Sequence, residues 1–403
     1  MKDKNKIFNT ILSSKQYPDN VDLRFDTKYG FLLDRDELEN FLEFKDNIKS
    51  VSKIDLPLKS FNSKGVYYIL SKELVGNIMD YLDIVASDVH NYSKIVNSTY
   101  DEITLSHVLS EIEGSLKIEG VNTTRREVQH VIETQEIKNN NDRIILNMYN
   151  GIQFITKTPD FNKDNLKMLY ELLSDGCLLE KDILGEKKYR DGPVYIGNHE
   201  CCPFDKIDEC MDSLFEYINN SNGDLIYNFL KPFIAHYYFV YIHPYFDYNG
   251  RTARMIETWI INNTPLSSAP LFLSEAINDN KKKYYKAIEK TRYSHNDLTY
   301  FLIYMTEYAT KYYLAYKKVN DVREKLNRNG EQVAPIIYHY YKKILVCDLD
   351  WFAWGMLRDS ANLGDVSKQA VLKNLNKLQE LGILQSKKNS SGEKIFKLND
   401  NFW

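Results

Sequence analysis

The sequence has little cysteine and no long apolar run, and each shortage excludes a class of protein. Its five cysteines among 403 residues include one adjacent pair and no Cys-x-x-Cys spacing, so neither a disulfide framework nor a zinc module is indicated. The longest apolar run, residues 229–242, contains Lys231, Pro232 and His236 and is too short to span a bilayer. We therefore expect a protein of the reducing cytoplasm that has no membrane partner.

A strong excess of one charge sign is also missing. The 52 Lys and Arg residues nearly balance 56 Asp and Glu, for a net charge of −4, which argues against a protein that coats nucleic acid through charge alone. The first residues include lysines but no apolar stretch behind them, so we expect no signal peptide. With 43% hydrophobic and 27% charged residues, the composition is that of a globular protein of about two to three domains.

Apolar residues at helical spacing dominate the middle of the chain. Residues 1–98 mix short apolar runs with turn signals and a helical stretch at 74–96, and we assign them no function. Residues 99–318 predict long amphipathic helices, so the predicted fold class is mainly α. These helices span 102–118, 124–138, 141–157, 163–174, 204–220, 224–242, 251–262, 279–290 and 296–318.

One stretch interrupts the helical pattern. Residues 189–197 place aromatic and β-branched residues on both sides of Asp191-Gly192-Pro193, which predicts a short hairpin with its turn at those three residues. The exposed edge of a hairpin can pair with an extended peptide through main-chain hydrogen bonds. A hairpin with a purely structural role is the alternative.

A third unit is predicted over residues 327–403, and it begins with a polar stretch, residues 327–330, that ends in the helix breaker Gly330. Helical runs at 331–345, 349–358 and 367–381, followed by two strands within 382–398, are the pattern of a winged helix-turn-helix. Ser367 is the expected N-cap of the third helix, and Gly382 is expected to end it. Both DNA binding and protein contacts remain open for this unit. Its polar and basic residues are Lys368, Gln369, Lys373, Asn374 and Lys377 on the helix and Lys387, Lys388 and Lys394 at the wing.

The segment with the clearest chemistry is residues 243–254, HPYFDYNGRTAR. The apolar run before it should be helical, and Pro244 ends that helix because proline disfavours helix in the preceding residue. A new helix is predicted to start at Arg251, just after Gly250. The N-terminus of a helix binds anions through free N–H groups. Two arginines in its first turn, Arg251 and Arg254, oppose the helix dipole, which indicates that a polyanion binds there.

Two further side chains of this loop suit a nucleotide reaction. Asp247 could hold the Mg²⁺ that accompanies a nucleotide, because magnesium binds through few carboxylates and phosphate oxygens. Neutral His243, at the start of the loop, suits the removal of a hydroxyl proton near pH 7. Each residue alone is common in structural roles. Together they predict a phosphoryl-type transfer to a hydroxyl.

The string as a whole resembles the signature of the Fic (filamentation induced by cAMP) family, His-Pro-Phe-x-Asp/Glu-Gly-Asn-Gly-Arg-x-x-Arg. It departs at Tyr245, which keeps an aromatic ring, and at Tyr248, which replaces the first glycine. A β-carbon at position 248 costs little if φ is negative and about 1 kcal/mol or more otherwise. Gly250 is retained where the Doc-like branch has lysine, which favours transfer of AMP over transfer of phosphate.

The resemblance covers roughly residues 100–315 and implies a Fic helical core in which 189–197 form the short β-hairpin flap. It implies a protein adenylyltransferase that moves AMP from ATP to a Ser, Thr or Tyr hydroxyl of a target protein and modifies itself, with Mg²⁺ as cofactor. It makes His243 the catalytic base and Asp247 the metal ligand. The implied nucleotide-binding residues are Tyr248, Asn249, Gly250, Arg251, Thr252, Ala253, Arg254, Tyr284 and Tyr285, and the implied target-positioning residues of the flap are Val194, Tyr195, Ile196 and Gly197.

Residues 115–120, SLKIEG, resemble the inhibitory motif of the family, Ser/Thr-x-x-x-Glu-Gly/Asn, in a predicted helix at about 102–120. Ser115 and Glu119 share one helix face, and Gly120 suits a helix C-terminus. The resemblance implies that Glu119 pairs with Arg254 and holds ATP in a non-productive pose. A surface glutamate on an amphipathic helix is the alternative.

Two other functions fit the same residues. The site could remove AMP from a modified protein, with Glu119 orienting a water molecule. The chain could instead be a DNA-binding regulator that senses ATP with weak or no catalysis, although such a sensor has no need of His243 as a base. Besides an unidentified target protein, the candidate partners are DNA and a second copy of the chain.

Overall fold

The computed structural model describes residues 53–61, 65–95, 100–197, 199–220, 224–263, 273–361, 363 and 366–402, with the backbone alone at 85–95, 100–107 and 199. The fold is mainly helical with small antiparallel hairpins, which confirms the predicted fold class. The chain divides into two compact units, and the boundary lies between Ala309 and Thr310. The predicted division into three parts stays a prediction, and its first 52 residues lie outside the described ranges.

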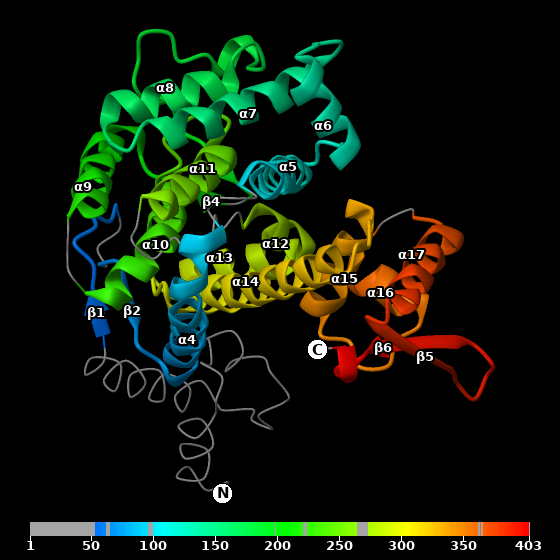
Figure 1. The fold of residues 1–403 in the computed structure, drawn as a ribbon. Helices are drawn as coiled ribbons and strands as arrows, with labels where there is room; N and C mark the ends of the chain where they lie inside the picture. The colour runs from blue at the N-terminus through cyan, green and yellow to red at the C-terminus, as the bar shows by residue number, and fades with distance from the viewer. Residues whose placement is uncertain are drawn as a thin grey trace, which may run out of the picture. The chain divides into compact units, whose positions relative to one another are not determined.

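The first unit holds most of the helices (Figure 1). They are α4 (Lys72–Ile95), α5 (Tyr100–Ile118), α6 (Arg125–Thr134), α7 (Asn140–Lys157), α8 (Lys163–Ser174), α9 (Ile207–Asn219), α10 (Leu225–Ile242), α11 (Asn249–Asn262), α12 (Ser274–Asp279) and α13 (Lys281–Tyr293). The boundary between the units falls inside α14 (Thr299–Arg328), which continues ten residues past the predicted end at 318.

Helix α10 lies in the core of the first unit. It is apolar around its whole circumference, and nearly all of its side chains from Phe229 onward are buried, as expected of a helix that other elements surround. Asp224 caps its start by accepting a hydrogen bond from the Tyr227 N–H at 2.9 Å. Helix α10 packs along α11, which α7 and α8 cover from the other side. The loop between α10 and α11, residues 243–248, is therefore held between two buried helices.

Three two-stranded antiparallel sheets are present in the described residues. The first pairs β1 (Lys53–Asp55) with β2 (Tyr67–Ile69), with Ile54 opposite Tyr68. The second pairs β3 (Tyr195–Ile196) with β4 (His199–Glu200), with Tyr195 opposite Glu200. The third pairs β5 (Leu384–Lys388) with β6 (Lys394–Leu398), with Ser386 opposite Phe396.

The hairpin predicted for residues 189–197 forms later in the chain, and its predicted turn is wrong. The strands begin at Tyr195, and Gly197, with φ of 60°, follows the first of them. A glycine with positive φ suits a tight hairpin turn. Residues 189–193 do not pair with each other as strands, because Arg190 binds His243 O through its side chain and Pro244 O through its backbone N–H instead.

The second unit contains α15 (Pro335–Cys347), α16 (Trp354–Ser360), α17 (Lys368–Glu380) and the β5–β6 hairpin, in the expected order. Ser367 caps α17 by accepting from the Ala370 N–H at 3.3 Å, and Gly382 follows the helix with φ of 76°. Buried Val371, Leu375 and Leu378 attach α17 to the core of this unit. The winged-helix assignment stays a prediction. None of the described helices is both long and apolar enough to cross a membrane.

Candidate active site

His243 ends α10 in the left-handed conformation, with φ of 54°. Its backbone N–H donates to Phe239 O at 2.9 Å. Burial lowers the pKa of the imidazole to about 4; the Val240 backbone opposes this effect, and the charge of Arg190 adds to it. Nδ1 is buried and has no partner within hydrogen-bonding geometry. The imidazole is therefore neutral at physiological pH, which is the form that accepts a proton.

The side chain of Asn249 braces the loop between the two helices. Its Oδ1 accepts from the Tyr245 N–H at 3.0 Å, and its Nδ2 donates to Tyr245 O at 2.8 Å. The Tyr245 ring is buried and stacks on Tyr170 with centroids 3.7 Å apart. Tyrosine thus serves as the aromatic anchor in place of the phenylalanine in the family pattern. The amide of Asn249 shapes the loop by binding its backbone.

No side chain caps the N-terminus of α11. Tyr248 is the N-cap and makes no side-chain cap hydrogen bond, and the first backbone bond of the helix runs from Thr252 N to Tyr248 O at 2.9 Å. The N–H groups of residues 249–251 therefore have no intrahelical partner. Thr252 and Ala253 have fully buried side chains, and Thr252 Oγ1 donates to Tyr248 O at 2.8 Å. A phosphate at this helix start would thus meet backbone N–H groups.

Tyr248 adopts a conformation that favours glycine, with φ of 68°. The predicted cost of a β-carbon at this position therefore applies, at about 1 kcal/mol. The ring is buried, and the Arg251 guanidinium carbon lies 3.4 Å from its centroid. A cation over a tyrosine face gains about 0.5 to 2 kcal/mol. The stacking on Arg251 thus offsets the backbone strain.

Asp247 lies on the solvent side of the same loop, beside the buried Arg251 of α11. Asp247 Oδ1 lies 3.7 Å from Arg251 Nη2, and the Asp247 side chain is 54% exposed. Arg251 Nε is buried without a partner. No group of three or more His, Cys, Asp or Glu side chains in the described ranges could hold a metal alone. One open carboxylate beside a phosphate-binding helix start nevertheless suits Mg²⁺, which binds through one or two carboxylates and phosphate oxygens.

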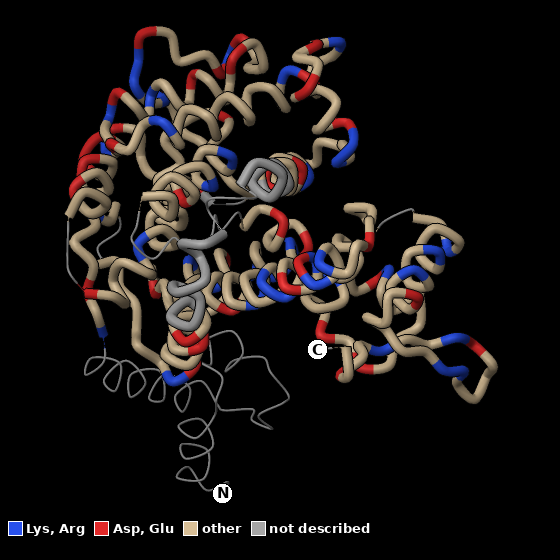
Figure 2. Tube along the Cα trace, viewed as in Figure 1, with Lys and Arg blue, Asp and Glu red and all other residues tan. Residues whose placement is uncertain are grey.

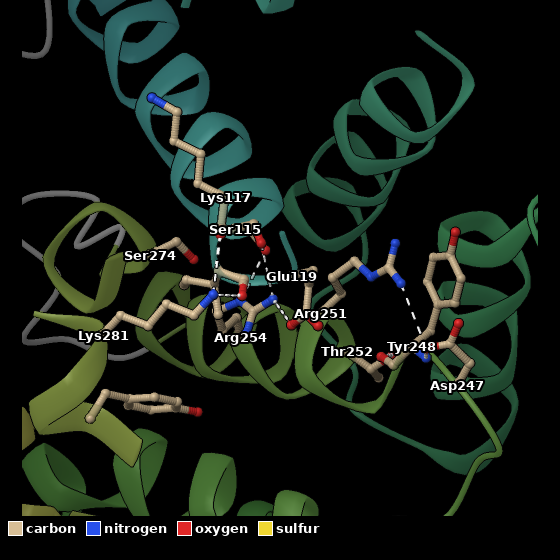
Figure 3. A network of polar contacts seen from close by, with 12 residues as sticks. Ser115, Lys117, Glu119, Asp247, Tyr248, Arg251, Thr252, Arg254, Ser274 and Lys281 are labelled. Carbon is tan, nitrogen blue, oxygen red and sulfur yellow. Dashed lines mark hydrogen bonds and ion pairs between the residues drawn. The ribbon is translucent and has the colours of Figure 1, made fainter. Parts of the chain in front are cut away.

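Arg254, one turn into α11, meets the end of α5 (Figure 3). Its Nη2 lies 2.7 Å from Glu119 Oε1, and its Nε donates to Ser115 Oγ at 2.9 Å. Burial raises the pKa of Glu119, but Arg254, Arg251 and Lys281 outweigh it, so the net shift is downward and the carboxylate is ionised. The structure therefore contains the expected pairing of Glu119 with Arg254 and adds Ser115 as a second partner of this arginine.

Two glycines allow the approach of Glu119. Gly120 ends α5 with φ of 80°; its N–H donates to Lys117 O and the Val121 N–H donates to Leu116 O, the paired bonds of a glycine C-cap. A β-carbon at Gly250 would lie 2.6 Å from Glu119 Oε1. Glycine at position 250 thus leaves the space that the carboxylate occupies.

Two side chains that sequence reasoning missed attach α5 to its neighbours. Lys281, at the start of α13, donates through Nζ to Ile118 O and, at 3.5 Å, to Lys117 O (Figure 3). Buried Glu111 accepts from the Ser274 N–H at 3.1 Å and from the Ser274 hydroxyl. Each partner lies more than 160 positions away in the chain, so no local signal in the sequence could reveal these pairs.

The two tyrosines predicted to bind nucleotide lie in different environments. Tyr284 is buried, and its hydroxyl lies 2.8 Å from His236 Nε2, while Glu257 holds His236 Nδ1. Tyr285 is 47% exposed. Tyr284 is thus anchored in the core between α10 and α13, and Tyr285 is the one whose ring faces solvent.

The flap residues are mostly open to solvent. Tyr195 is 61% exposed and Ile196 45% exposed, and the Cys201 N–H donates to Val194 O at 3.0 Å, which extends the pairing of the hairpin. Arg190, which sequence reasoning did not single out, is buried and donates to the backbone of the His243 loop and of the flap.

Comparisons with known proteins point to one family. Residues 160–261 match the model of the Fic/DOC family. Proteins named "Protein adenylyltransferase Fic" from Drosophila mojavensis and Drosophila grimshawi are 24% and 25% identical to this chain over 208 and 187 residues. These matches cover 49% and 43% of this chain, but only 39% and 36% of the two relatives.

Solved structures share the fold. A Fic family protein from Desulfovibrio desulfuricans G20 has a TM-score of 0.52 at 20% identity, over 83% of this chain and 98% of that one. Fic-1, residues 134–508, from C. elegans has a TM-score of 0.53 at 14% identity, over 79% of this chain and 84% of that one. The matched family region contains His243 and the whole start of α11.

Proposed function

This chain contains a Fic domain, and we propose that it is a protein adenylyltransferase that an inhibitory contact between Glu119 and Arg254 holds inactive. One observation carries the proposal: a neutral His243 and the open N-terminus of α11 lie at the two ends of one six-residue loop. The names of the curated relatives support AMP transfer as the reaction.

The residues of the loop and of the start of α11 have different roles in the proposed reaction. The N–H groups at the start of α11, with Arg251 and Arg254, bind the phosphates of ATP. Because Nδ1 of His243 is buried, Nε2 is the nitrogen that takes the proton from the target hydroxyl. The hydroxyl oxygen then bonds to the α-phosphorus and pyrophosphate leaves. Mg²⁺, held by Asp247 and phosphate oxygens, would neutralise charge on the phosphates.

The inhibitory contact removes part of this site. With Glu119 Oε1 at 2.7 Å, Arg254 already has an anionic partner, and the carboxylate lies against Gly250 at the helix start. A phosphate there would meet a negative charge and lack one of its two arginines. ATP would consequently bind without the phosphate alignment that transfer needs.

Self-modification tests the proposal directly. We expect purified Glu119→Gly protein with Mg²⁺ and ATP labelled at the α-phosphate to become labelled, wild type to label more slowly, and Glu119→Gly/His243→Ala to stay unlabelled. ATP labelled at the γ-phosphate should leave no label, which separates AMP transfer from phosphate transfer. A Glu119→Gly variant that binds ATP yet transfers no AMP would sink the proposal. Mass spectrometry of lysate treated with this variant would then identify targets.

Removal of AMP is a second candidate because Glu119 is ionised and its side chain is 30% exposed. A carboxylate in that state can orient a water molecule beside the phosphate site. We expect this activity to need Glu119, in contrast to AMP transfer. Glu119→Gly/His243→Ala protein that the Glu119→Gly variant has first modified in trans, and that is then separated from it, serves as the substrate for wild type and for the Glu119→Gly variant: release of AMP by wild type alone supports removal.

The charge of the second unit favours duplex DNA as a further partner. Residues 310–403 contain 16 Lys and Arg against 10 Asp and Glu, a net charge of +6, although the whole chain has −4. Lys368, Gln369, Lys373 and Lys377 of α17 are exposed, and Figure 2 shows basic positions along α17 and in the β5–β6 hairpin. We expect duplex binding that weakens steeply with salt and that Lys373→Glu reduces. No binding at low salt would leave protein contacts or a homodimer as the role of this unit.

A further inference from the structure

Arg190 links two parts of the molecule that the proposed reaction needs. Its side chain is 2% exposed. Nε donates to His243 O at 2.8 Å, Nη1 donates to Gly192 O at 2.6 Å and Nη2 donates to Cys202 O. Its backbone N–H donates to Pro244 O at 2.9 Å. One residue thus binds both carbonyls of the His-Pro pair and a carbonyl on each side of the flap.

The bonds to the loop hold His243 in an uncommon conformation. A residue other than glycine in the left-handed region costs about 1 kcal/mol and persists only where its surroundings determine it. The carbonyls of His243 and of Pro244 immediately after it are the groups that Arg190 binds. These two bonds act together with the His243 N–H bond to Phe239 O in holding His243 in this conformation.

The bonds to the flap hold the base of the β3–β4 hairpin. Gly192 lies before β3 and Cys202 lies after β4, so the guanidinium of Arg190 joins the two ends of the hairpin to each other. In the described residues β3 pairs with β4 alone, which leaves the other edge of β3 open. An extended segment of a target protein could pair there through its main chain.

We propose that Arg190 is a positioning residue that sets the place of the flap, and thereby of a target segment paired with it, relative to His243. The planar guanidinium suits this role because it directs several N–H groups along fixed lines, which lysine cannot do. A hydroxyl that lies about 1 Å from its proper place can slow a reaction about a hundredfold. This proposal rests on the proposed function, because the AMP-transfer measurement requires an active enzyme; the hydrogen-exchange measurement does not.

The alternative is a purely structural Arg190 whose loss destabilises the unit as a whole. Lys231 offers a matched control, because it is also buried and its Nζ also donates to backbone carbonyls, Ile218 O at 3.1 Å and Asn220 O at 2.7 Å. It lies at the other end of α10 from His243. Lys231→Met therefore shows how a general loss of stability, without a change at His243 or the flap, affects the rate of AMP transfer and the hydrogen exchange.

The test compares Arg190→Lys, Arg190→Met and Lys231→Met, each in the Glu119→Gly background. We expect Arg190→Met to lower the single-turnover rate of self-modification at least about tenfold. The Kd for ATP should stay within about threefold, because the hydrogen bonds described for Arg190 go to residues 192, 202, 243 and 244 and not to the start of α11. The single-turnover rate of Arg190→Lys should lie between that of the Glu119→Gly parent and that of Arg190→Met. Lys231→Met should keep the parent rate at temperatures where it is folded.

Hydrogen exchange gives a readout that needs no activity. In Arg190→Met, amides of residues 194–201 and 243–248 should exchange faster together, and in Lys231→Met they should not. Unchanged exchange in Arg190→Met would overturn the proposal, as would a transfer rate equal to that of the parent. If the Glu119→Gly parent itself transfers no AMP, the proposed function fails, and the exchange result still decides the role of Arg190.

Discussion

Glu119 Oε1 occupies the space beside Gly250, so close that a β-carbon at position 250 would lie only 2.6 Å away. The contact between Glu119 and Arg254 therefore depends on a glycine in α11. The arginine that Glu119 binds and the glycine that it touches belong to the same first turns of α11.

We expect Gly250→Ala to have opposite effects on stability in two backgrounds. In wild type, the methyl group pushes Glu119 away from Arg254 and lowers the free energy of unfolding. In Glu119→Gly the neighbour that remains is Arg254 Nη1, 3.3 Å from the added β-carbon, and alanine near the start of a helix is about 0.5 kcal/mol better than glycine. Urea unfolding of the four proteins should give a coupling free energy of about 1 to 2 kcal/mol. Additive effects of Gly250→Ala and Glu119→Gly on the free energy of unfolding would contradict the close approach of Glu119 to Gly250.

Lys281 should contribute to inhibition through the end of α5. Its ammonium donates to Ile118 O, one residue before Glu119. Losing a charged hydrogen bond in a partly exposed place costs about 1 kcal/mol, so Lys281→Met should raise AMP transfer about fivefold in wild type. In Glu119→Gly it should change nothing, since no inhibitory carboxylate remains to be released. Exposed Lys282→Met, on the same turn of α13, is the control and should leave both backgrounds unchanged.

The pH dependence of stability should report on Glu111. Burial raises its pKa to about 7, against the lowering effect of the Ser274 hydrogen bonds and Arg254. Between its usual value of 4.5 and about 7, the folded protein binds a proton that the unfolded chain has lost, so stability falls as pH rises through this range.

Glu111→Gln keeps the shape of the side chain and can still accept from the Ser274 N–H and donate to its hydroxyl. We expect the fall in unfolding free energy between pH 5 and 7, about 2 kcal/mol in wild type, to disappear in the variant. Urea unfolding across this range measures it. If the unfolding free energy of wild type and of Glu111→Gln fell equally over this range, a group other than Glu111 would be responsible.

Two opposing effects meet at Tyr248. Replacing it by glycine relieves about 1 kcal/mol of backbone strain but removes a buried ring worth about 3 kcal/mol. We therefore expect Tyr248→Gly to lower the free energy of unfolding by about 2 kcal/mol and to weaken ATP binding, because Arg251 loses the ring that orients it. Tyr248→Phe keeps the ring over Arg251 and should match wild type in both measurements. A stabilised glycine variant would show that strain outweighs burial.

Most of the candidate site could be predicted because its residues lie close together in the chain. Pro244 sets the start of the loop by backbone preference, and the arginines follow at helical spacing, so short-range rules suffice there. The predicted helix start at Arg251 is wrong by two residues, because α11 begins at Asn249 and the left-handed residue before it is Tyr248, not Gly250. Short-range rules also suffice for Ser115, Glu119 and Gly120 at the end of α5. Their contact with Arg254 was inferred from the resemblance, since no local rule joins residues 135 positions apart.

The hairpin shows where local rules fail. Asp191-Gly192-Pro193 is a strong turn signal in isolation, yet Arg190 ties this segment to the His243 loop. The hydrogen bonds of a buried backbone must be satisfied, and here the partners come from distant segments. The strands therefore pair around Gly197 instead.

The segment of residues 243–254, with the proposed base His243 and the uncapped start of α11, was determined by the sequence itself. Backbone preferences and side-chain chemistry act over a few residues and need no fold to be recognised. Only the tertiary structure decided that Lys281 and Glu111 attach α5, that Arg190 joins the loop to the flap, and that Tyr284 lies in the core. Those contacts join residues far apart in the chain, and only the packing of the buried helices brings them within hydrogen-bonding distance.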